Sequence, residues 1–166
     1  MSIFSHIILT APNKQTSDVY LKELESLREH LVCLQSCEIY CTSDPYGQRV
    51  GSGGGTLNAL DYLVHNISYS DILNARIVII NSGGDSKRSP LHSICGKAWS
   101  TINVDINQTT YSCPMAFLIN ELSEFCQNIP RGSVVVACSD VILDIFRVNS
   151  RTLKINSSLN LLLLFC

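Results

Sequence analysis

The chain carries the stretch VGSGGGTLNAL at residues 50–60, in which four glycines and a serine are followed at once by a helix-forming sequence. Glycine adopts positive φ values and lacks a Cβ, so such a loop lets backbone N–H groups approach a ligand closely. Thr56 is a suitable N-cap, and Leu57, Ala59 and Leu60 begin an apolar face behind it. A helix N-terminus favours negative charge through its N–H groups and its dipole. The stretch therefore predicts a phosphate-binding loop, with a flexible surface turn as the alternative.

Two common glycine motifs do not fit this spacing. The dinucleotide-binding fingerprint needs a small residue where Thr56 stands and an acidic residue at a strand end about 20 positions later. Asp71 is near that distance, but it falls in a polar connection. A P-loop needs Gly, four residues and then Gly-Lys-Ser/Thr, whereas Gly96 and Lys97 are followed by alanine. Both motifs are excluded.

A second glycine turn follows the β-branched run at 76–81. The glycines and cations of this segment are Gly83, Gly84, Lys87, Arg88 and Lys97. Ligands of open α/β sheets bind outside the carboxyl ends of the strands. Two glycine turns, each after an expected strand, therefore make the phosphate site a stronger prediction than either turn alone. For the cations the alternative is a solvated surface loop.

These two segments resemble a known family. DPYGQRVGSGGGTLNAL at 44–60 and NSGGDSKRSPLHSICGKAWS at 81–100 are similar to the amino-terminal region of fucose-1-phosphate guanylyltransferases and the related fucokinases. Some members of that group join a GDP-fucose pyrophosphorylase domain to a sugar kinase domain. The resemblance covers most of the chain and implies a partial nucleotidyltransferase domain at 1–146, with an atypical tail at 147–166.

The fold class follows from the alternation of expected strands and helices, which predicts an α/β fold with three layers and a mostly parallel sheet. Strands are expected at about 4–10, 38–42, 76–81, 98–104 and 133–138, and helices at about 17–31, 56–65 and 115–126. Residues 68–75 are expected to form a connection. The resemblance adds that the sheet is of the sugar nucleotidyltransferase type and is incomplete at the C-terminus.

The buried-type strand at 133–138 is followed by Ser139 and Asp140. A carboxylate at the carboxyl end of a strand can hold Mg²⁺ against substrate phosphates, because this ion uses few protein ligands and keeps several waters. In the sugar nucleotidyltransferases that the chain resembles, an aspartate in such a position binds the metal. The resemblance therefore implies a Mg²⁺ ligand at Asp140, with a helix N-cap as the alternative.

The resemblance also implies roles for the glycine motifs and the cations. The implied nucleotide-binding residues are Gly51, Gly53, Gly54, Gly55, Thr56, Gly83 and Gly84. The implied catalytic residues are the cations. Lys87 and Arg88 would neutralise the β and γ phosphates and the leaving pyrophosphate, and Lys97 would lie near the α phosphate.

The implied function is nucleotidyl transfer that forms GDP-fucose from GTP and fucose-1-phosphate. The family places the sugar site beyond the matched region, so the chain by itself is expected to be inactive. Two alternatives stay open at this point. One is a fragment of an L-fucokinase, and the other is a non-catalytic remnant that binds nucleotide weakly or not at all.

The amino-acid composition limits the classes of protein and of binding partner that remain possible. The chain of 166 residues is 46% hydrophobic and 16% charged, which is typical of a globular domain with a sizeable core. Its net charge of −2 favours neither nucleic acid nor a membrane surface. No signal peptide or membrane-spanning run is recognisable, so a cytoplasmic location is expected. The eight cysteines are accordingly expected to be reduced, structural thiols.

Overall fold

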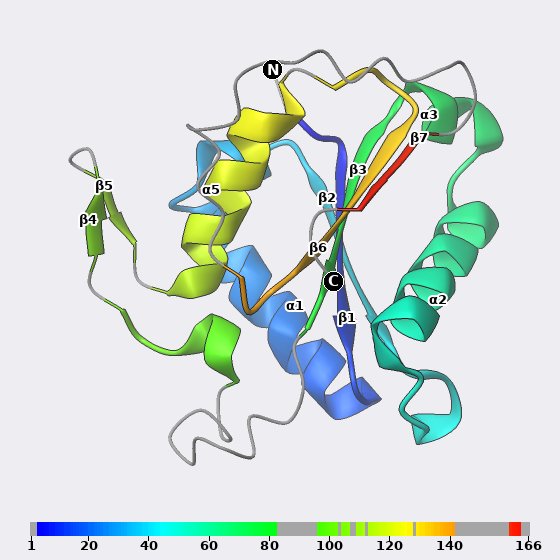
Figure 1. Cartoon of the computed structure of the whole chain (residues 1–166), viewed down its shortest axis with the longest axis horizontal. Helices are drawn as coiled ribbons and strands as arrows, with labels where there is room; N and C mark the ends of the chain where they lie inside the picture. Colours follow the sequence, from blue (N-terminus) through cyan, green and yellow to red (C-terminus); the bar gives the residue numbers. More distant parts are fainter. Residues whose placement is uncertain are drawn as a thin grey trace.

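A five-stranded parallel sheet organises the computed structural model, which describes residues 3–82, 96–102, 104–106, 109–111, 113–127, 129–141 and 160–163 (Figure 1). The strands are β1 (His6–Ala11), β2 (Glu38–Ser43), β3 (Arg76–Asn81), β6 (Ser133–Cys138) and β7 (Asn160–Leu163). Their order in the sheet is β2-β1-β3-β6-β7, and each neighbouring pair is parallel. The expectation that the strands near 4–10, 38–42, 76–81 and 133–138 share one sheet is confirmed.

Helices cover both faces of this sheet, which gives three layers (Figure 1). The helices are α1 (Lys14–Arg28), α2 (Gly51–Asn66), α3 (Tyr69–Asn74) and α5 (Pro114–Cys126), and the 3-10 turns are η1 (Val32–Leu34), η2 (Pro45–Gly47) and η3 (Lys97–Trp99). Helices α1 and α5 lie on one face, and α2 and α3 lie on the other.

The two hydrophobic cores follow from the alternation of side chains along each strand. In β1, Ile7 and Leu9 pack with residues of α1 and α5, whereas Ile8 packs with residues of α2 and α3. All three side chains are fully buried. Strands that are buried on both faces need continuous apolar runs rather than alternating ones, which explains the sequences of β1, β3 and β6. The three-layer α/β fold predicted from the sequence is confirmed.

Helix α2 begins at Gly51 and not at Thr56, so the expected helix start is corrected. Thr56 is one turn inside the helix, where its Oγ1 donates a hydrogen bond to the Ser52 carbonyl oxygen at 2.9 Å. Glycine is a poor helix former in isolation. Tertiary packing overrides that preference here, because a Cβ on Gly55 would lie 3.4 Å from Oδ1 of Asn81 on β3.

Three further element boundaries differ from expectation. Helix α1 covers Lys14–Arg28 rather than about 17–31, and its N-cap is Asn13, whose side chain accepts a hydrogen bond from the Thr16 N–H. The strand expected at 98–104 is wrong, because Lys97–Trp99 is a 3-10 turn and the strand β4 (Val104–Ile106) begins later, paired with β5 (Thr109–Tyr111). The connection expected at 68–75 contains α3, whose N-cap residue Ser68 accepts a hydrogen bond from the Asp71 N–H. In the regions 97–99 and 68–75 the structure thus has a short element that the sequence did not predict. Among the described residues, no helix is both long enough and apolar enough to cross a bilayer.

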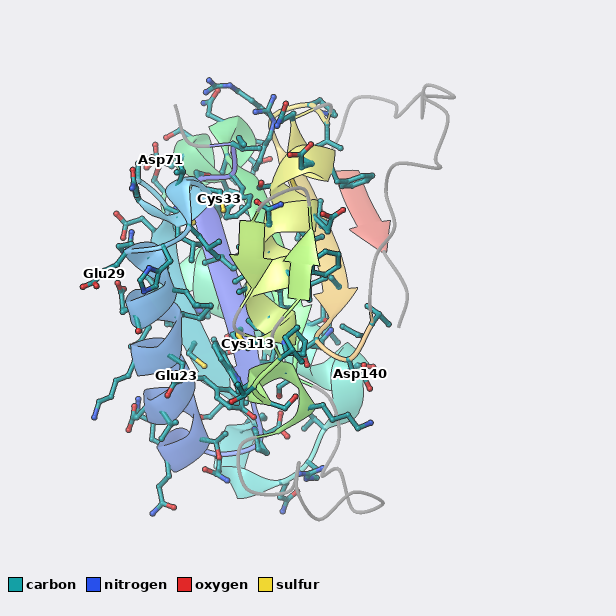
Figure 2. All side chains as sticks on the ribbon, turned by 90° about the vertical axis from the view of Figure 1, so that its left-hand side faces the viewer. Glu23, Glu29, Cys33, Asp71, Cys113 and Asp140 are labelled. Atoms are coloured by element: carbon teal, nitrogen blue, oxygen red, sulfur yellow. The ribbon has the colours of Figure 1, made fainter. Side chains whose placement is uncertain are left out.

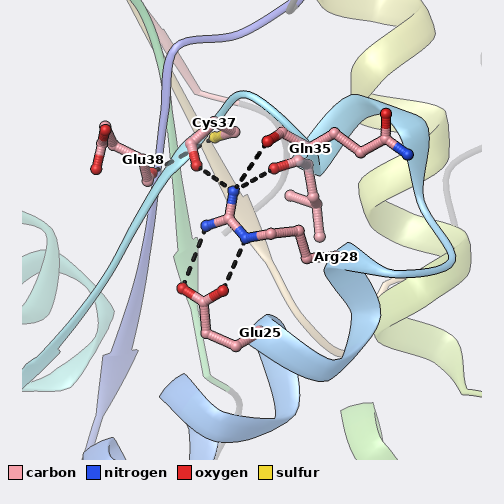
Figure 3. A network of polar contacts seen from close by, with 6 residues as sticks. Glu25, Arg28, Gln35, Cys37 and Glu38 are labelled. Atoms are coloured by element: carbon pink, nitrogen blue, oxygen red, sulfur yellow. Dashed lines mark hydrogen bonds and ion pairs between the residues drawn. The ribbon is translucent and has the colours of Figure 1, made fainter.

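Arg28 clamps the chain between α1 and β2 (Figure 3). Its Nε donates to Glu25 at 2.7 Å, and its Nη1 donates to the carbonyl oxygens of Leu34 at 2.6 Å and Cys37 at 2.8 Å. Leu34 is the last residue of the 3-10 turn η1, and Cys37 directly precedes β2. A planar guanidinium can serve a carboxylate and carbonyl groups at the same time, which an ammonium group cannot do with the same geometry.

We expect Arg28→Ala to lower the free energy of unfolding by about 1.5–3 kcal/mol, the range for hydrogen bonds that involve a charged group. The loss arises because two carbonyl groups and a carboxylate lose their donor. Urea unfolding followed by circular dichroism would measure it. Lys14→Ala is the matched control, because Lys14 pairs with Asp18 on the solvent side of the same helix at 2.8 Å. Equal losses of unfolding free energy in Arg28→Ala and Lys14→Ala would contradict this role of Arg28.

Several cysteines lie in or next to the hydrophobic core between the sheet and the helices α1 and α5. Burial raises the pKa of Cys37 and of Cys126 to about 12, and that of Cys41 to about 11. These groups are therefore protonated and neutral at physiological pH. Within the described residues, no group of three or more His, Cys, Asp or Glu side chains is placed to hold a metal ion.

Candidate functional site

A cleft of about 340 Å³ lies at the carboxyl end of the sheet. Its walls come from the ends of β1, β3 and β6, from the first turn of α2, and from the segment between β2 and α2. Thr10, Asn81 and Cys138 belong to the last residues of their strands and all line it. In open α/β sheets this is the edge at which ligands bind, because the strand ends and the following loops converge there.

The first turn of α2 contributes Gly51 and Ser52 to the cleft wall. Gly51 has a φ of +70°, a conformation that favours glycine. At the start of an α-helix the first N–H groups have no carbonyl partner within the helix. In α2 these are the N–H groups up to Gly53, whereas those of Gly54 and Gly55 fall where the helical pattern engages them. The turn therefore presents backbone donors at one side of the cleft.

A chain of buried polar side chains, the polar relay of Thr10, Asn81 and Thr56, lies behind this turn. Thr10 Oγ1 donates to Asn81 Oδ1 at 3.3 Å, and Asn81 Nδ2 donates to Thr56 Oγ1 at 2.9 Å. Thr56 Oγ1 then donates to the Ser52 carbonyl oxygen at 2.9 Å. The Ser82 N–H donates to Thr10 Oγ1 at 3.2 Å. The relay thus joins β1, β3 and α2, and its members Thr10 and Asn81 also line the cleft.

Lys97 pairs with Asp140, which lines the cleft, although Lys97 itself is not part of the cleft wall. Asp140 follows β6 and lines the cleft (Figure 2), and its Oδ2 lies 3.9 Å from Lys97 Nζ. Lys97 is held by η3, in which the Trp99 ring packs 5.7 Å, centroid to centroid, from the Tyr20 ring of α1. The lysine and aspartate side chains are 50% and 37% exposed. A pair this exposed contributes little to stability, so both groups can exchange their partner for a ligand at small cost.

The structure brings part of the predicted site together. Gly51 and Asp140 line the cleft, and Lys97 contacts Asp140. Thr56 does not contribute to the cleft wall and lies in the polar relay instead. Gly53, Gly54 and Gly55 follow Gly51 in the first turns of α2. The remaining predicted residues, Gly83, Gly84, Lys87 and Arg88, lie outside the described residues.

Sequence reasoning did not single out several residues of this cleft. Arg49 and Asp44 line it, although both belong to the stretch 44–60 that carried the resemblance. Asn81 is predicted from the sequence only as the end of a strand and the first residue of the motif at 81–100. Its position directly after the apolar run of β3 is the signal that could have identified it, because polar residues at the carboxyl ends of parallel strands gather at one edge.

The cleft contains side chains that suit a divalent cation. Asp44 and Asp140 supply carboxylate oxygens, the ligand type that Mg²⁺ prefers, and Asp140 is partly exposed to solvent. Mg²⁺ is usually held by one or two carboxylates together with waters and substrate phosphates rather than by a protein cage. The residues present therefore fit a Mg²⁺ ion that binds together with a phosphate ligand.

Comparison with known proteins identifies the family. The model of the fucose pyrophosphorylase domain matches residues 70–161, which include β3, β6 and the start of β7. This match continues past the boundary at 146 that the sequence suggested, and that boundary stays a prediction. No solved structure matches the chain.

Two curated relatives are similar to the chain. Fucose-1-phosphate guanylyltransferase from Mus musculus is 26% identical over 81% of this chain and 22% of its own length. L-fucokinase/L-fucose-1-P guanylyltransferase from Bacteroides fragilis is 33% identical over 39% of this chain and 7% of its own length. The chain thus spans less than a quarter of either relative. With more than half of its residues matched by the family model, the chain belongs to the fucose pyrophosphorylase domain family.

Proposed function

We propose that the cleft binds the phosphates of GTP, and that the domain takes part in the formation of GDP-fucose from GTP and fucose-1-phosphate. The observation that carries this proposal is that three kinds of group lie in or next to one cleft. These are the backbone donors of α2, the ammonium group of Lys97 and the carboxylate of Asp140. Backbone donors and cations stabilise phosphate oxygens, and a carboxylate suits the metal ion that accompanies them.

The proposed reaction needs alignment and charge stabilisation more than covalent catalysis. An oxygen of the fucose-1-phosphate attacks the α-phosphorus of GTP. The bond from that phosphorus to the bridging oxygen breaks, and pyrophosphate leaves with the electron pair. Lys97 would neutralise charge near the α phosphate, and the first turn of α2 would hold the phosphates in line. Mg²⁺ at Asp140 would neutralise phosphate oxygens in the same cleft.

Titration calorimetry with GTP and Mg²⁺ tests the binding step, and release of pyrophosphate after addition of fucose-1-phosphate tests the transfer. We expect the 166-residue chain to bind GTP without turnover. A polypeptide that continues through the length of the curated relatives should release pyrophosphate. Absence of binding to both GTP and inorganic tripolyphosphate would reject the proposal. Binding without transfer in the longer protein would favour the non-catalytic alternative.

Lys87→Ala and Arg88→Ala should each weaken GTP binding by about 1.5–3 kcal/mol, the range for hydrogen bonds to charged groups. The reason is that the resemblance assigns these cations to the β and γ phosphates. The same calorimetric titration measures the effect, with Lys22→Ala on α1 as the control for a loss of one positive charge. Unchanged affinity in both variants would place the two cations on a solvated surface.

A further inference from the structure

We propose that the polar relay of Thr10, Asn81 and Thr56 sets the anion affinity of the cleft, and that Thr56 is a positioning residue within it. Thr56 acts through the Ser52 carbonyl, and Ser52 lines the cleft. The proposal rests on the proposed function only for the identity of the ligand. The mechanical coupling along the relay is a property of the ligand-free protein and is tested separately.

Because the side chains of the relay are buried, each of them must keep its hydrogen-bond partner. Thr10, Asn81 and Thr56 are 6%, 3% and 9% exposed, so water cannot easily replace a missing partner. A buried polar group that loses its partner costs more than the hydrogen bond contributed, because its desolvation is no longer compensated. The three side chains are therefore held in one arrangement, and the backbone groups that they bind are held with them.

The direction of each hydrogen bond is also determined. The Asn81 amide accepts from Thr10 through Oδ1 and donates to Thr56 through Nδ2. Each threonine hydroxyl has a single proton. Thr56 uses its proton on the Ser52 carbonyl, and Thr10 uses its proton on Asn81. No member can reverse without breaking a bond at another member, so the relay is cooperative.

The backbone partners of the relay surround the cleft. Ser52 is in the first turn of α2, and the Ser82 N–H, bound by Thr10, is where the chain leaves β3 toward the second glycine motif. The Asn81 carbonyl oxygen accepts from the Ser139 N–H at 2.9 Å, directly before Asp140. One residue, Asn81, therefore links the helix start, the exit from β3 and the exit from β6.

The glycines of α2 complete this arrangement. A Cβ on Gly55 would lie 3.6 Å from the Cβ of Thr10 and 3.4 Å from Oδ1 of Asn81. The helix thus runs so close to β1 and β3 that the Thr56 hydroxyl can reach the Asn81 amide. This position explains why Thr56 supports the cleft from behind and does not form its wall.

Calorimetric titration with inorganic tripolyphosphate and with GTP tests the consequence for binding. Thr56→Val, which removes the hydroxyl, should weaken both ligands about fivefold to tenfold, corresponding to roughly 1–1.4 kcal/mol. Thr56→Ser, which keeps the hydroxyl, should restore affinity to within about twofold. Thr42→Val is the matched control, because Thr42 on β2 is similarly buried and its Oγ1 has no hydrogen-bond partner among the residues that the structure describes. Its affinity should not change.

Hydrogen exchange in the ligand-free protein tests the coupling itself. In Thr56→Val the Ser82 amide, two hydrogen-bonded side chains away, should exchange at least about fivefold faster relative to the core amide of Ile79, because the relay loosens as a unit. The Ile79 amide corrects for any change in global stability. If Thr56→Val is too unstable to measure, Thr10→Val is compared with Thr10→Ser at the Thr56 amide instead, because the Ser82 N–H binds Thr10 Oγ1 directly.

The outcomes separate the two proposals. If the natural sequence binds neither tripolyphosphate nor GTP, the proposed function fails, and the relay is then judged by exchange alone. If exchange at Ser82 in Thr56→Val matches that of Thr42→Val, the relay proposal is overturned. It is also overturned if Thr56→Val and Thr56→Ser bind the ligands equally well.

Discussion

GTP binding by an Asp140→Asn variant should lose its dependence on Mg²⁺, and in EDTA it should be unchanged or tighter than in the natural sequence. In the presence of Mg²⁺ we expect a loss of about 1.5–3 kcal/mol, the range for interactions with a charged group. The expected change in GTP affinity therefore differs between Mg²⁺ and EDTA. With Mg²⁺ present the carboxylate binds the cation, whereas without it the carboxylate repels the phosphates. Removing its charge also releases Lys97, which lies 3.9 Å away, for the phosphates.

Titrations of GTP at several Mg²⁺ concentrations and in EDTA measure both parts of this prediction. Asp61→Asn is the control, because Asp61 is a well-exposed acidic residue on α2 and does not contribute to the cleft. A Mg²⁺ dependence that survives in Asp140→Asn would assign the metal to another group, with Asp44 as the first to test. Equal weakening with and without Mg²⁺ would indicate a structural role for Asp140.

Gly54→Ala should both destabilise the domain and weaken GTP binding, whereas Gly53→Ala should not destabilise the domain. A Cβ on Gly54 would lie 2.5 Å from the Cβ of Val50, a separation that real structures do not tolerate. Because that atom belongs to the residue that precedes α2, the start of the helix must move. We expect a loss of about 1–3 kcal/mol in the free energy of unfolding, the usual range for overpacking. The affinity for GTP should fall as well, because the first turn of α2 lines the cleft.

Gly53 is the matched control for this change. A Cβ there would have no neighbour within 4 Å among the described residues, and alanine favours a helix more than glycine does. Its N–H group remains available in the alanine variant. Urea unfolding and GTP titration of both variants measure the effects. Equal behaviour of the two variants would show that the first turn of α2 is not held in one position.

The residues that determined the sheet could be recognised without the structure. The apolar runs of β1, β3 and β6 are continuous, and such runs are needed when both faces of a strand are covered. The leucines of α1 also repeat with helical spacing, and Leu24 and Leu27 are buried as that spacing predicts. Local sequence was sufficient to predict these strands and α1, because the periodicity of the apolar residues agrees with their burial in the structure.

Short elements were not predictable in this way. η3 lies where a strand was expected, and its Trp99 packs against Tyr20, which is far away in the sequence. The start of α2 lies within the glycines for a similar reason, since Gly55 packs against residues of β1 and β3. In each case a contact between distant segments decided a conformation that propensity alone would not favour.

The sequence by itself determined the α/β fold, the family and the proposal that the two glycine motifs bind phosphate. These depend on residue types in a fixed order along the chain. The tertiary structure alone decided that Asn81 joins Thr10 and Thr56, that Lys97 meets Asp140, and that Thr56 lies behind the cleft. The physical reason is that parallel strands bring their carboxyl ends to one edge, so residues 25 to 71 positions apart become hydrogen-bond partners.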